Sequence, residues 1–491
     1  MRSTSPIVAG LSAAAVQSFV LKAAGIVCQI VCALFLTKEQ FGEVAVGLGI
    51  LALFNFSGAI NLNAACLRRG KAACRWEVSA CYFAVVFGAI SMGIALLSSP
   101  LLVAWFNGNE NTAFLIKIGC LSFIPNSLIG VRCAVLKGDF EFGEAARIVS
   151  LKSMADSIGT IFFAIGGWGA MSFVLPRVVT AWVVALVVFR KRLPALLSPL
   201  PSTFLRIVEI IRVGALSIPG FVALYITTQL DKLVVAKYFS LSEAGLYFFA
   251  YNLAAQSINV AGQIVRESII PVLARENNPA VQVDRFARII RTTLVFTSPL
   301  LMIQAVAIYP LLHFMYGNKW DAAAPLIQIL SIAMAVRMGG IASGSLLKIQ
   351  NRFGLLSFLN AIYGILFIGV VAMASQLKEI EFVTWAVLLF YTAISAVHFF
   401  VPIYKVAKRP IYMTINTFAV VPLALLAFSI PFYLSSIAFG WHTTAAALST
   451  SLFGSVLYLA ILFYFDGEMV TLIRNFLRRV GGSLIQPMKN K

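Results

Sequence analysis

Charged residues are scarce in this sequence. Asp, Glu, Lys and Arg make up 12% of the 491 residues, whereas 60% of the residues are hydrophobic. A soluble globule of this size needs much more polar surface to cover its core, so the composition excludes an ordinary soluble enzyme or binding domain. The chain is expected to lie in a lipid bilayer.

Motifs of nucleotide and metal chemistry are absent. The sequence contains no GxxxxGK[ST] phosphate loop and no HExxH helix. ATP hydrolysis and zinc protease chemistry are therefore excluded, and no cofactor or metal is expected. The loops between apolar runs are too short for a catalytic domain, so we expect a protein that is not an enzyme.

Cysteines are few and confined to the first part of the chain, at positions 28, 32, 66, 74, 81, 120 and 133. Most of them fall inside apolar runs, which argues against a disulfide framework. Cys28 and Cys32 are one helical turn apart and could suggest a metal pair, but no His lies nearby. We expect all seven to be packing residues.

Long apolar runs dominate what is present. A membrane-spanning helix needs about 20 apolar residues, and continuous runs of this kind exclude a transmembrane barrel, whose strands alternate. The sequence therefore predicts an all-α polytopic membrane protein. The fourteen predicted spans are 13–36, 44–62, 78–99, 113–135, 148–165, 171–189, 213–235, 244–265, 292–316, 324–346, 354–375, 382–404, 412–434 and 443–465.

The basic residues predict the orientation of these spans. The chain holds 38 Lys and Arg residues against 19 Asp and Glu residues. We assign 28 of the basic residues to the two termini and the even-numbered loops, and four (Lys38, Lys237, Lys319 and Lys378) to the odd-numbered loops. The positive-inside rule then makes both termini cytoplasmic, and it explains the basicity without nucleic acid as a partner.

Two pairs of similar short segments, each of which we call a sequence echo, indicate an internal repeat. LKGDFEFG at 136–143 matches LKIQNRFG at 347–354 with an offset of 211, and KEQFG at 38–42 matches LSEAG at 241–245 with an offset of 203. Each echo pairs a span with the span six later, so the two copies are parallel repeats. We expect an N-lobe (1–189), a cytoplasmic linker (190–212), a C-lobe (213–404), two extra helices (405–465) and a basic cytoplasmic tail (466–491).

Six basic residues are assigned to the spans themselves. Three of them, Lys117, Arg132 and Lys232, lie near the ends of their spans. A long basic side chain at such a depth can reach the interface, so we expect these three to snorkel.

The other embedded charges are deeper. Lys22, Arg177 and Arg337 are too far from the span ends for snorkelling to explain them all, and a charge at the bilayer centre costs about 2.5 to 3.5 kcal/mol. Asp156 can neutralise one cation, with Lys22 as one candidate partner. Asp156 and Asp231 are also candidates for ion coupling. A cavity with excess cations suits a phosphate or pyrophosphate, so Arg337, Lys22 and Arg177 are the predicted substrate-binding residues.

Two amphipathic stretches flank the C-terminal half of the sequence. TFLRIVEIIRVG at 203–214 and TLIRNFLRRV at 471–480 place apolar residues at helical spacing against Arg. Both patterns are typical of helices that lie in the membrane interface and attract anionic lipids. For the second stretch, a merely solvated end is an equal alternative.

Three stretches carry a resemblance to a known family: KEQFGEVAVGLGILALFNFSGAINLNAACLRR at 38–69, DKLVVAKYFSLSEAGLYFFAYNLA at 231–254 and YGNKWDAAAPLIQILSIAMAVR at 316–337. The chain resembles the polysaccharide-transporter flippases of the multidrug/oligosaccharidyl-lipid/polysaccharide exporter superfamily. The resemblance implies a fold like that of the multidrug exporters, with two six-helix lobes and two extra helices. It also implies alternating-access movement of a polyprenyl-pyrophosphate-linked oligosaccharide to the outer leaflet of the bacterial inner membrane, for an exopolysaccharide, capsule or O-antigen.

The same resemblance implies polymerase and chain-length proteins of the pathway as candidate partners. Two alternatives stay open. A cation-coupled multidrug exporter shares the lobes, although the cationic excess disfavours cationic cargo. A membrane polymerase or ligase is an enzyme and normally needs a large outer loop, which the sequence does not predict.

Overall fold

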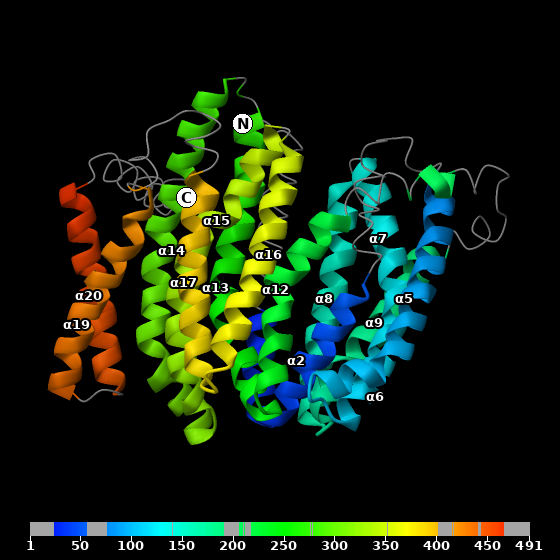
Figure 1. The fold of residues 1–491 in the computed structure, drawn as a ribbon, viewed down its shortest axis with the longest axis horizontal. Coiled ribbons are helices and arrows are strands. Elements are labelled where there is room, and N and C mark those ends of the chain that lie inside the picture. Colours follow the sequence, from blue (N-terminus) through cyan, green and yellow to red (C-terminus); the bar gives the residue numbers. More distant parts are fainter. Residues whose placement is uncertain are drawn as a thin grey trace, which may run out of the picture. The chain divides into compact units, whose positions relative to one another are not determined.

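The computed structural model describes residues 24–55, 76–139, 141–190, 206–209, 211, 218–274, 276, 278–350, 352–400, 415, 417–439 and 443–465. All regular structure in these ranges is helical, and they contain no strand (Figure 1). The predicted all-α class is confirmed.

Each predicted apolar run overlaps a described helix, because a continuous apolar run in lipid must satisfy its backbone groups internally. The first run overlaps the helix Ala24–Phe35. The others overlap α2 (Lys38–Leu53), α5 (Glu77–Trp105), α6 (Glu110–Gly119) with α7 (Phe123–Gly138), α8 (Phe142–Ile165), α9 (Leu175–Phe189), α12 (Ile218–Tyr238), α13 (Leu241–Ala274), α14 (Pro279–Tyr316), α15 (Ala324–Ile349), α16 (Phe353–Ser375), α17 (Ile380–Phe400), α19 (Val420–Phe439) and α20 (Thr444–Phe465). Three short 3₁₀ helices complete the elements: η2 (Cys120–Ser122), η3 (Gly169–Phe173) and η4 (Gly317–Ala323).

The exposed surface of these helices is apolar. Leu97 on α5 is 85% exposed, and Phe162 on α8 and Leu452 on α20 are each 72% exposed. Among the described residues, nine helical stretches are long and apolar enough to cross a membrane. Lipid contact accounts for such exposure, whereas water would penalise it. The protein is a multi-pass membrane protein.

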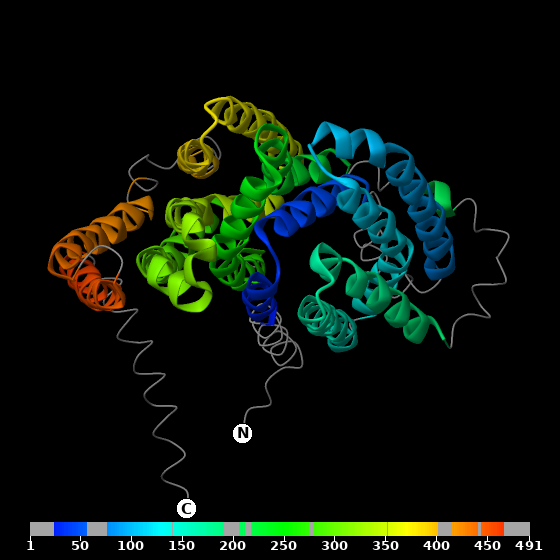
Figure 2. The same cartoon turned by 90° about the horizontal axis from the view of Figure 1, so that it is seen from below.

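The chain divides into two compact units. Unit 1 comprises Met1–Gln256 with Arg352–Phe390, and unit 2 comprises Ser257–Asn351 with Tyr391–Lys491. In unit 1, α12 packs along α16, and in unit 2, α19 packs along α20 (Figure 1, Figure 2). The lobe and linker boundaries expected from the sequence stay predictions.

The first sequence echo coincides with two equivalent helix junctions. In the first copy, α7 ends at Gly138 and α8 begins at Phe142; in the second, α15 ends at Ile349 and α16 begins at Phe353. Both starting residues are the Phe of the shared Phe-Gly pair. The echo therefore marks the turn between the fourth and fifth spans of each copy.

The second echo coincides with two equivalent helix starts. The Thr37 hydroxyl accepts a hydrogen bond from the Gln40 backbone N at 3.2 Å, and the Gln40 side chain accepts one from the Thr37 N at 3.0 Å. Ser240 and Glu243 make the same reciprocal pair, at 3.3 and 3.0 Å. These capping boxes satisfy backbone donors that a helix start leaves free, and they fix where α2 and α13 begin.

The glycines that follow these caps let α2 and α13 cross in direct contact. A Cβ added to Gly42 would overlap the Leu241 carbonyl oxygen, and one added to Gly245 would overlap the Lys38 carbonyl oxygen. Each glycine thus faces the first residue of the other helix. Such a reciprocal contact between equivalent residues is expected of two parallel repeats. We call this region the α2–α13 crossing.

A residue with left-handed backbone adds a polar contact to unit 1 near the ends of α5 and α12. Asn107, between α5 and α6, has a φ of 52°, a left-handed value that few residues other than Gly adopt. Its amide nitrogen donates to the carbonyl oxygens of Lys237 at 2.8 Å and Ala236 at 3.3 Å. The Lys237 ammonium lies 4.4 Å from the Trp105 ring centroid. Asn107 therefore supplies partners for carbonyls that the last turn of α12 leaves free.

The α2–α13 crossing makes a prediction about stability. Replacing Gly42 or Gly245 with Ala forces a methyl group against backbone that cannot turn aside, so each change is expected to lower the free energy of unfolding by ~1 to 3 kcal/mol. Thermal unfolding of the full-length protein in detergent micelles measures the effect as a lower apparent Tm.

Two glycines of the first echo are matched controls. Gly143 and Gly354 are exposed, and an added Cβ at either meets nothing within 4 Å. Gly143→Ala and Gly354→Ala are expected to leave the apparent Tm unchanged or to raise it, because Ala is the better helix former by ~0.5 to 1 kcal/mol. A Gly42→Ala protein as stable as Gly143→Ala would contradict the importance of the crossing.

Candidate functional site

A cavity of about 530 Å³ lies within unit 1. Its lining comes from the helix Ala24–Phe35, α2, the junction of α6 and α7, α8, α9, α12 and α13. Helices from both copies of the repeat therefore contribute to one space.

Among the described residues, three cations and one carboxylate line this cavity: Lys152 and Asp156 on α8, Arg177 on α9 and Lys232 on α12. Three positive charges less one negative charge leave a formal excess of two. Such an excess favours an anionic occupant.

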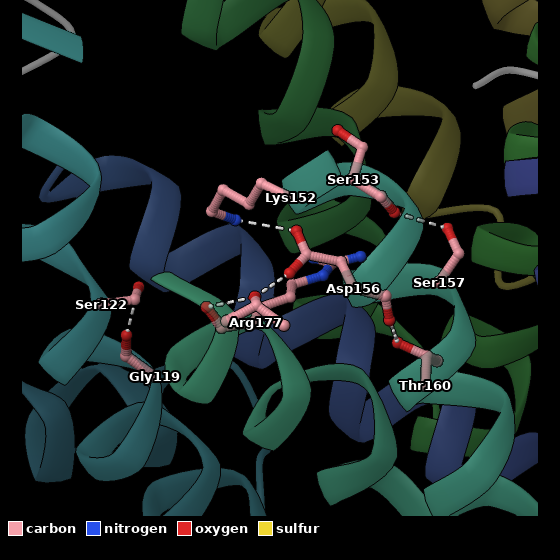
Figure 3. A network of polar contacts seen from close by, with 9 residues as sticks. Gly119, Ser122, Lys152, Ser153, Asp156, Ser157, Thr160 and Arg177 are labelled. Atoms are coloured by element: carbon pink, nitrogen blue, oxygen red, sulfur yellow. Dashed lines mark hydrogen bonds and ion pairs between the residues drawn. The ribbon is translucent and has the colours of Figure 1, made fainter. Parts of the chain in front are cut away.

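The carboxylate of Asp156 is held by two neighbours (Figure 3). The Lys152 ammonium lies 2.8 Å from Asp156 Oδ2, one turn earlier on the same helix, and both side chains are about four-fifths buried, at 17% and 20% exposure. The Thr180 hydroxyl on α9 donates to Asp156 Oδ1. These contacts neutralise Asp156 and tie α8 to α9.

Of the three cavity cations, Arg177 is the one whose charged group makes no ion pair or hydrogen bond with a described side chain. It follows Pro176 in the first turn of α9, and its side chain is exposed on the cavity lining. Its carbonyl oxygen accepts a bond from Thr180 at 3.4 Å, while its guanidinium makes no ion pair or hydrogen bond with the described residues. Five N–H donors in a planar fork are thus available to an anion in the cavity.

Lys232 was expected from the sequence to snorkel to the membrane interface, but its side chain is buried. It is 5% exposed, and its ammonium lies 4.8 Å from the Tyr251 ring centroid and 5.6 Å from that of Phe248. It also donates to the Gln229 side chain at 3.1 Å. Aromatic faces and an amide stabilise the charge in place of the interface, so the snorkelling prediction is wrong here.

Arg132 is also paired rather than snorkelling. Its guanidinium lies 3.3 Å from Glu77 Oε1 of α5, with side-chain exposures of 11% and 7%. Glu77 is 55 residues away in the sequence, so spacing along the helix gave no sign of this partner. Lys117 is exposed at its position on α6.

The remaining predicted site residues lie elsewhere. Asp231 is 1% exposed and accepts a hydrogen bond from the Tyr247 hydroxyl at 3.0 Å. Arg337, in unit 2, has its guanidinium carbon 4.7 Å from the Tyr391 ring centroid and a nitrogen 3.9 Å from the Met334 sulfur. Lys22 falls outside the described residues. Of the two predicted cationic ligands that the structure describes, Arg177 lines the cavity of unit 1 and Arg337 does not.

Lys152 is a cavity residue that the sequence analysis missed. It was counted with the basic loop residues, although it lies within the predicted span 148–165. Lys152 lies four residues before Asp156 on the same helix face, and this spacing could have predicted their ion pair.

The described cysteines are buried free thiols: Cys28, Cys32, Cys81, Cys120 and Cys133. The sulfurs of Cys28 and Cys32 are 4.0 Å apart. Among the described residues, no group of three or more His, Cys, Asp or Glu side chains is placed to hold a metal ion. Cys66 and Cys74 lie outside the described residues.

Comparison with known proteins gives sequence and structural relatives. The family described as "Polysaccharide biosynthesis protein" matches residues 31–325. The lipopolysaccharide biosynthesis protein WzxC of Escherichia coli K12 is 24% identical over 434 residues, covering 87% of this chain and 85% of WzxC. The succinoglycan biosynthesis transport protein ExoT of Rhizobium meliloti is 24% identical over 319 residues, covering 62% of each.

Solved structures share the fold. The lipid II flippase MurJ in an inward closed conformation superposes with a TM-score of 0.75 at 13% identity, covering 93% of this chain and 99% of MurJ. An inward-facing multidrug resistance transporter of the MATE family superposes with a TM-score of 0.62 at 13% identity, covering 82% of this chain and 99% of that one. The two-lobe transporter fold is confirmed. The chain belongs to the polysaccharide biosynthesis protein family, and it shares its fold with MurJ and the MATE transporter.

Proposed function

We propose that this protein moves a polyprenyl-pyrophosphate-linked oligosaccharide from the cytoplasmic to the outer leaflet of a bacterial cytoplasmic membrane. The observation that carries the proposal is the cationic excess of the cavity in unit 1. A pyrophosphate that leaves water loses its hydration, and cations fixed in a low-dielectric space compensate that loss. Family membership supports a glycan cargo, and the MurJ fold supports transport of a lipid-linked one.

Arg177 is the proposed pyrophosphate ligand. Lys152 forms an ion pair with Asp156, and the ammonium of Lys232 lies against aromatic rings. The guanidinium of Arg177, in contrast, makes no ion pair or hydrogen bond with a described residue. A guanidinium matches two phosphate oxygens with parallel N–H donors, which an ammonium cannot do. The prenyl chain stays in lipid while the head group occupies the cavity.

Transport is proposed to occur by alternating access, in which opposite ends of the cavity open in turn. The positive-inside rule assigns the starts of α2 and α13 to the outer side. In that orientation the α2–α13 crossing and the Asn107 contacts lie on the outer side of unit 1. Asp156 and Asp231 remain candidates for coupling to an ion gradient.

The drug-exporter alternative has weaker support. The MATE likeness shows the shared fold alone, and three cations against one carboxylate would repel a cationic drug. A polymerase or ligase is also less well supported, because the described helices on the proposed outer side are joined by short turns, such as residues 106–109 and 166–168. ExoT is named a succinoglycan biosynthesis transport protein, WzxC a lipopolysaccharide biosynthesis protein and MurJ a lipid II flippase, and these names favour a transporter.

The orientation can be tested with two glutamates in equivalent first turns. Glu110 begins α6 and Glu144 lies in the first turn of α8, and both are exposed. In a cysteine-free background, Glu110→Cys is expected to react with a membrane-impermeant maleimide added to intact cells, and Glu144→Cys only after lysis. The opposite pattern would invert the orientation, and labelling of both in intact cells would rule out the predicted topology.

The Arg177 proposal predicts a graded loss of transport. Arg177→Lys keeps the charge but loses the fork, Arg177→Ala loses both, and Arg177→Glu repels the cargo. Loss of a charge-assisted bond is worth ~1.5 to 3 kcal/mol, so Arg177→Ala is expected to lower export about tenfold or more, with Arg177→Lys intermediate and Arg177→Glu lowest.

The measurement is polysaccharide export in a strain lacking the native gene, with membrane levels checked by immunoblot. Arg147→Ala is the matched control, because Arg147 is an exposed arginine of unit 1 that does not line the cavity. Export by Arg177→Ala equal to that of Arg147→Ala would remove Arg177 from the substrate site.

Arg337 and Lys22 remain proposed substrate ligands. If Arg337 binds the anion, Arg337→Lys is expected to retain part of the export activity and Arg337→Ala little. If its contact with Tyr391 serves folding instead, Arg337→Ala lowers the apparent Tm and the membrane level together with export. The same export assay, combined with immunoblotting and thermal unfolding, separates the two.

A further inference from the structure

The cavity of unit 1 carries a second chemical feature besides its cations. Six carboxamide side chains among the described residues line it, from four helices and the segment that follows α2: Gln29, Asn55, Asn126, Gln229, Asn252 and Gln256. Cavities that take apolar drugs are mostly apolar with a few polar groups. The amides therefore point to a cargo with many hydrogen-bonding groups.

Four of these amides come from the helix Ala24–Phe35, α12 and α13, whereas Lys152, Asp156 and Arg177 come from α8 and α9. We call the first set, Gln29, Gln229, Asn252 and Gln256, the amide wall. We call the second set the cation wall. The two walls belong to different helices and differ in chemistry. The amide wall consists of neutral carboxamides, and the ammonium of the neighbouring Lys232 is engaged by Gln229 and by the Phe248 and Tyr251 rings. The cavity is therefore suited to a cargo with two chemically distinct parts.

Hydrogen bonds order part of the amide wall. Gln29 Nε2 donates to the Phe249 carbonyl oxygen at 3.2 Å, and its side-chain oxygen is 3.5 Å from Gln256 Nε2. Gln229 accepts the bond from Lys232. Fixed amides of this kind lose little rotamer freedom when a ligand binds, which favours specific recognition.

The rest of the amide wall has free hydrogen-bonding capacity. Asn252 makes no side-chain hydrogen bond with a described residue, and of Gln256 only the amide nitrogen is engaged. Both line the cavity half-buried and lie one turn apart on α13, in line with Phe248 one turn earlier. This stripe offers amide oxygens, amide N–H groups and an aromatic ring along one helix face.

We propose that the amide wall binds the sugar part of the cargo, with Asn252 and Gln256 as residues that determine glycan recognition. A sugar hydroxyl both donates and accepts, and a carboxamide offers two donors and an acceptor that match adjacent hydroxyl groups. Neutral amides make this match without repelling the phosphates. The inference rests on the proposed function, because it assumes that the cation wall holds the pyrophosphate.

The experiment compares two lipids on the purified full-length protein in nanodiscs of phosphatidylethanolamine and phosphatidylglycerol. One probe is undecaprenyl pyrophosphate. The other is the glycan-carrying undecaprenyl pyrophosphate extracted from a deletion strain of the organism that carries this gene. The wild-type protein is expected to bind the glycan-carrying lipid more tightly, and the ratio of the two Kd values measures glycan recognition.

Asn252→Leu combined with Gln256→Leu is expected to lower this ratio about tenfold, because several neutral hydrogen bonds are lost. The Kd for undecaprenyl pyrophosphate is expected to stay within about twofold, which also shows that the variant is folded. If the double Leu variant no longer binds undecaprenyl pyrophosphate, the ratio of Kd values is measured on the smaller double variant, Asn252→Ala with Gln256→Ala. Gln376→Leu is the control, since Gln376 is exposed and does not line the cavity.

Arg177→Ala separates this inference from the proposed function. It is expected to weaken binding of both lipids while the ratio is kept. Equal wild-type affinity for the two lipids, or an unchanged ratio in the amide variants, would mean that water alone occupies the amide wall, and the inference would fall. Binding of neither lipid by the wild-type protein would instead contradict the proposed function.

Discussion

The crossing of α2 and α13 is the contact on which unit 1 depends. Gly42 and Gly245 each lie against the first carbonyl of the other helix, so the crossing admits no side chain larger than hydrogen at either position. Capping boxes fix the residues at which both helices start. Because the helices cross close to these starts, the crossing constrains the directions of the two helix axes. Phe41 and Phe248 flank it with ring centroids 6.5 Å apart, and both line the cavity. The two glycines thus set how closely α2 and α13 approach each other beside the cavity.

The charges of the cavity follow from how each is paired. Lys152 and Asp156 neutralise one another on α8, and Lys232 is held by aromatic rings and an amide. The guanidinium of Arg177 makes no hydrogen bond or ion pair with a described residue, whereas Asp156 is bonded by Lys152 and Thr180. A membrane makes an unpaired charge costly, so a guanidinium without an ion-pair partner among the described residues supports the proposal of an anionic cargo. Family membership independently favours a glycan pathway.

The fold was largely predictable from the sequence, and the site only in part. Long apolar runs and capping motifs are local signals, which explains why the helices and their junctions agree with the structure. Arg177 was found because of its depth in a span. Partners distant in the sequence were not predictable: Glu77 for Arg132, and Tyr251 for Lys232. The amide wall was missed because uncharged amides leave no mark in a charge count, and Lys152 because it was assigned to a loop.

Transport in purified form tests the account most directly. The full-length protein would be reconstituted into vesicles that contain glycan-carrying undecaprenyl pyrophosphate in both leaflets, with ethidium enclosed as a cationic drug in a parallel preparation. Movement of the glycan lipid between leaflets, followed by its accessibility to an added glycosidase, is the predicted result, with no protein-dependent loss of ethidium. Release of ethidium without movement of the glycan lipid would contradict the assignment of the cationic cavity to a pyrophosphate-linked cargo.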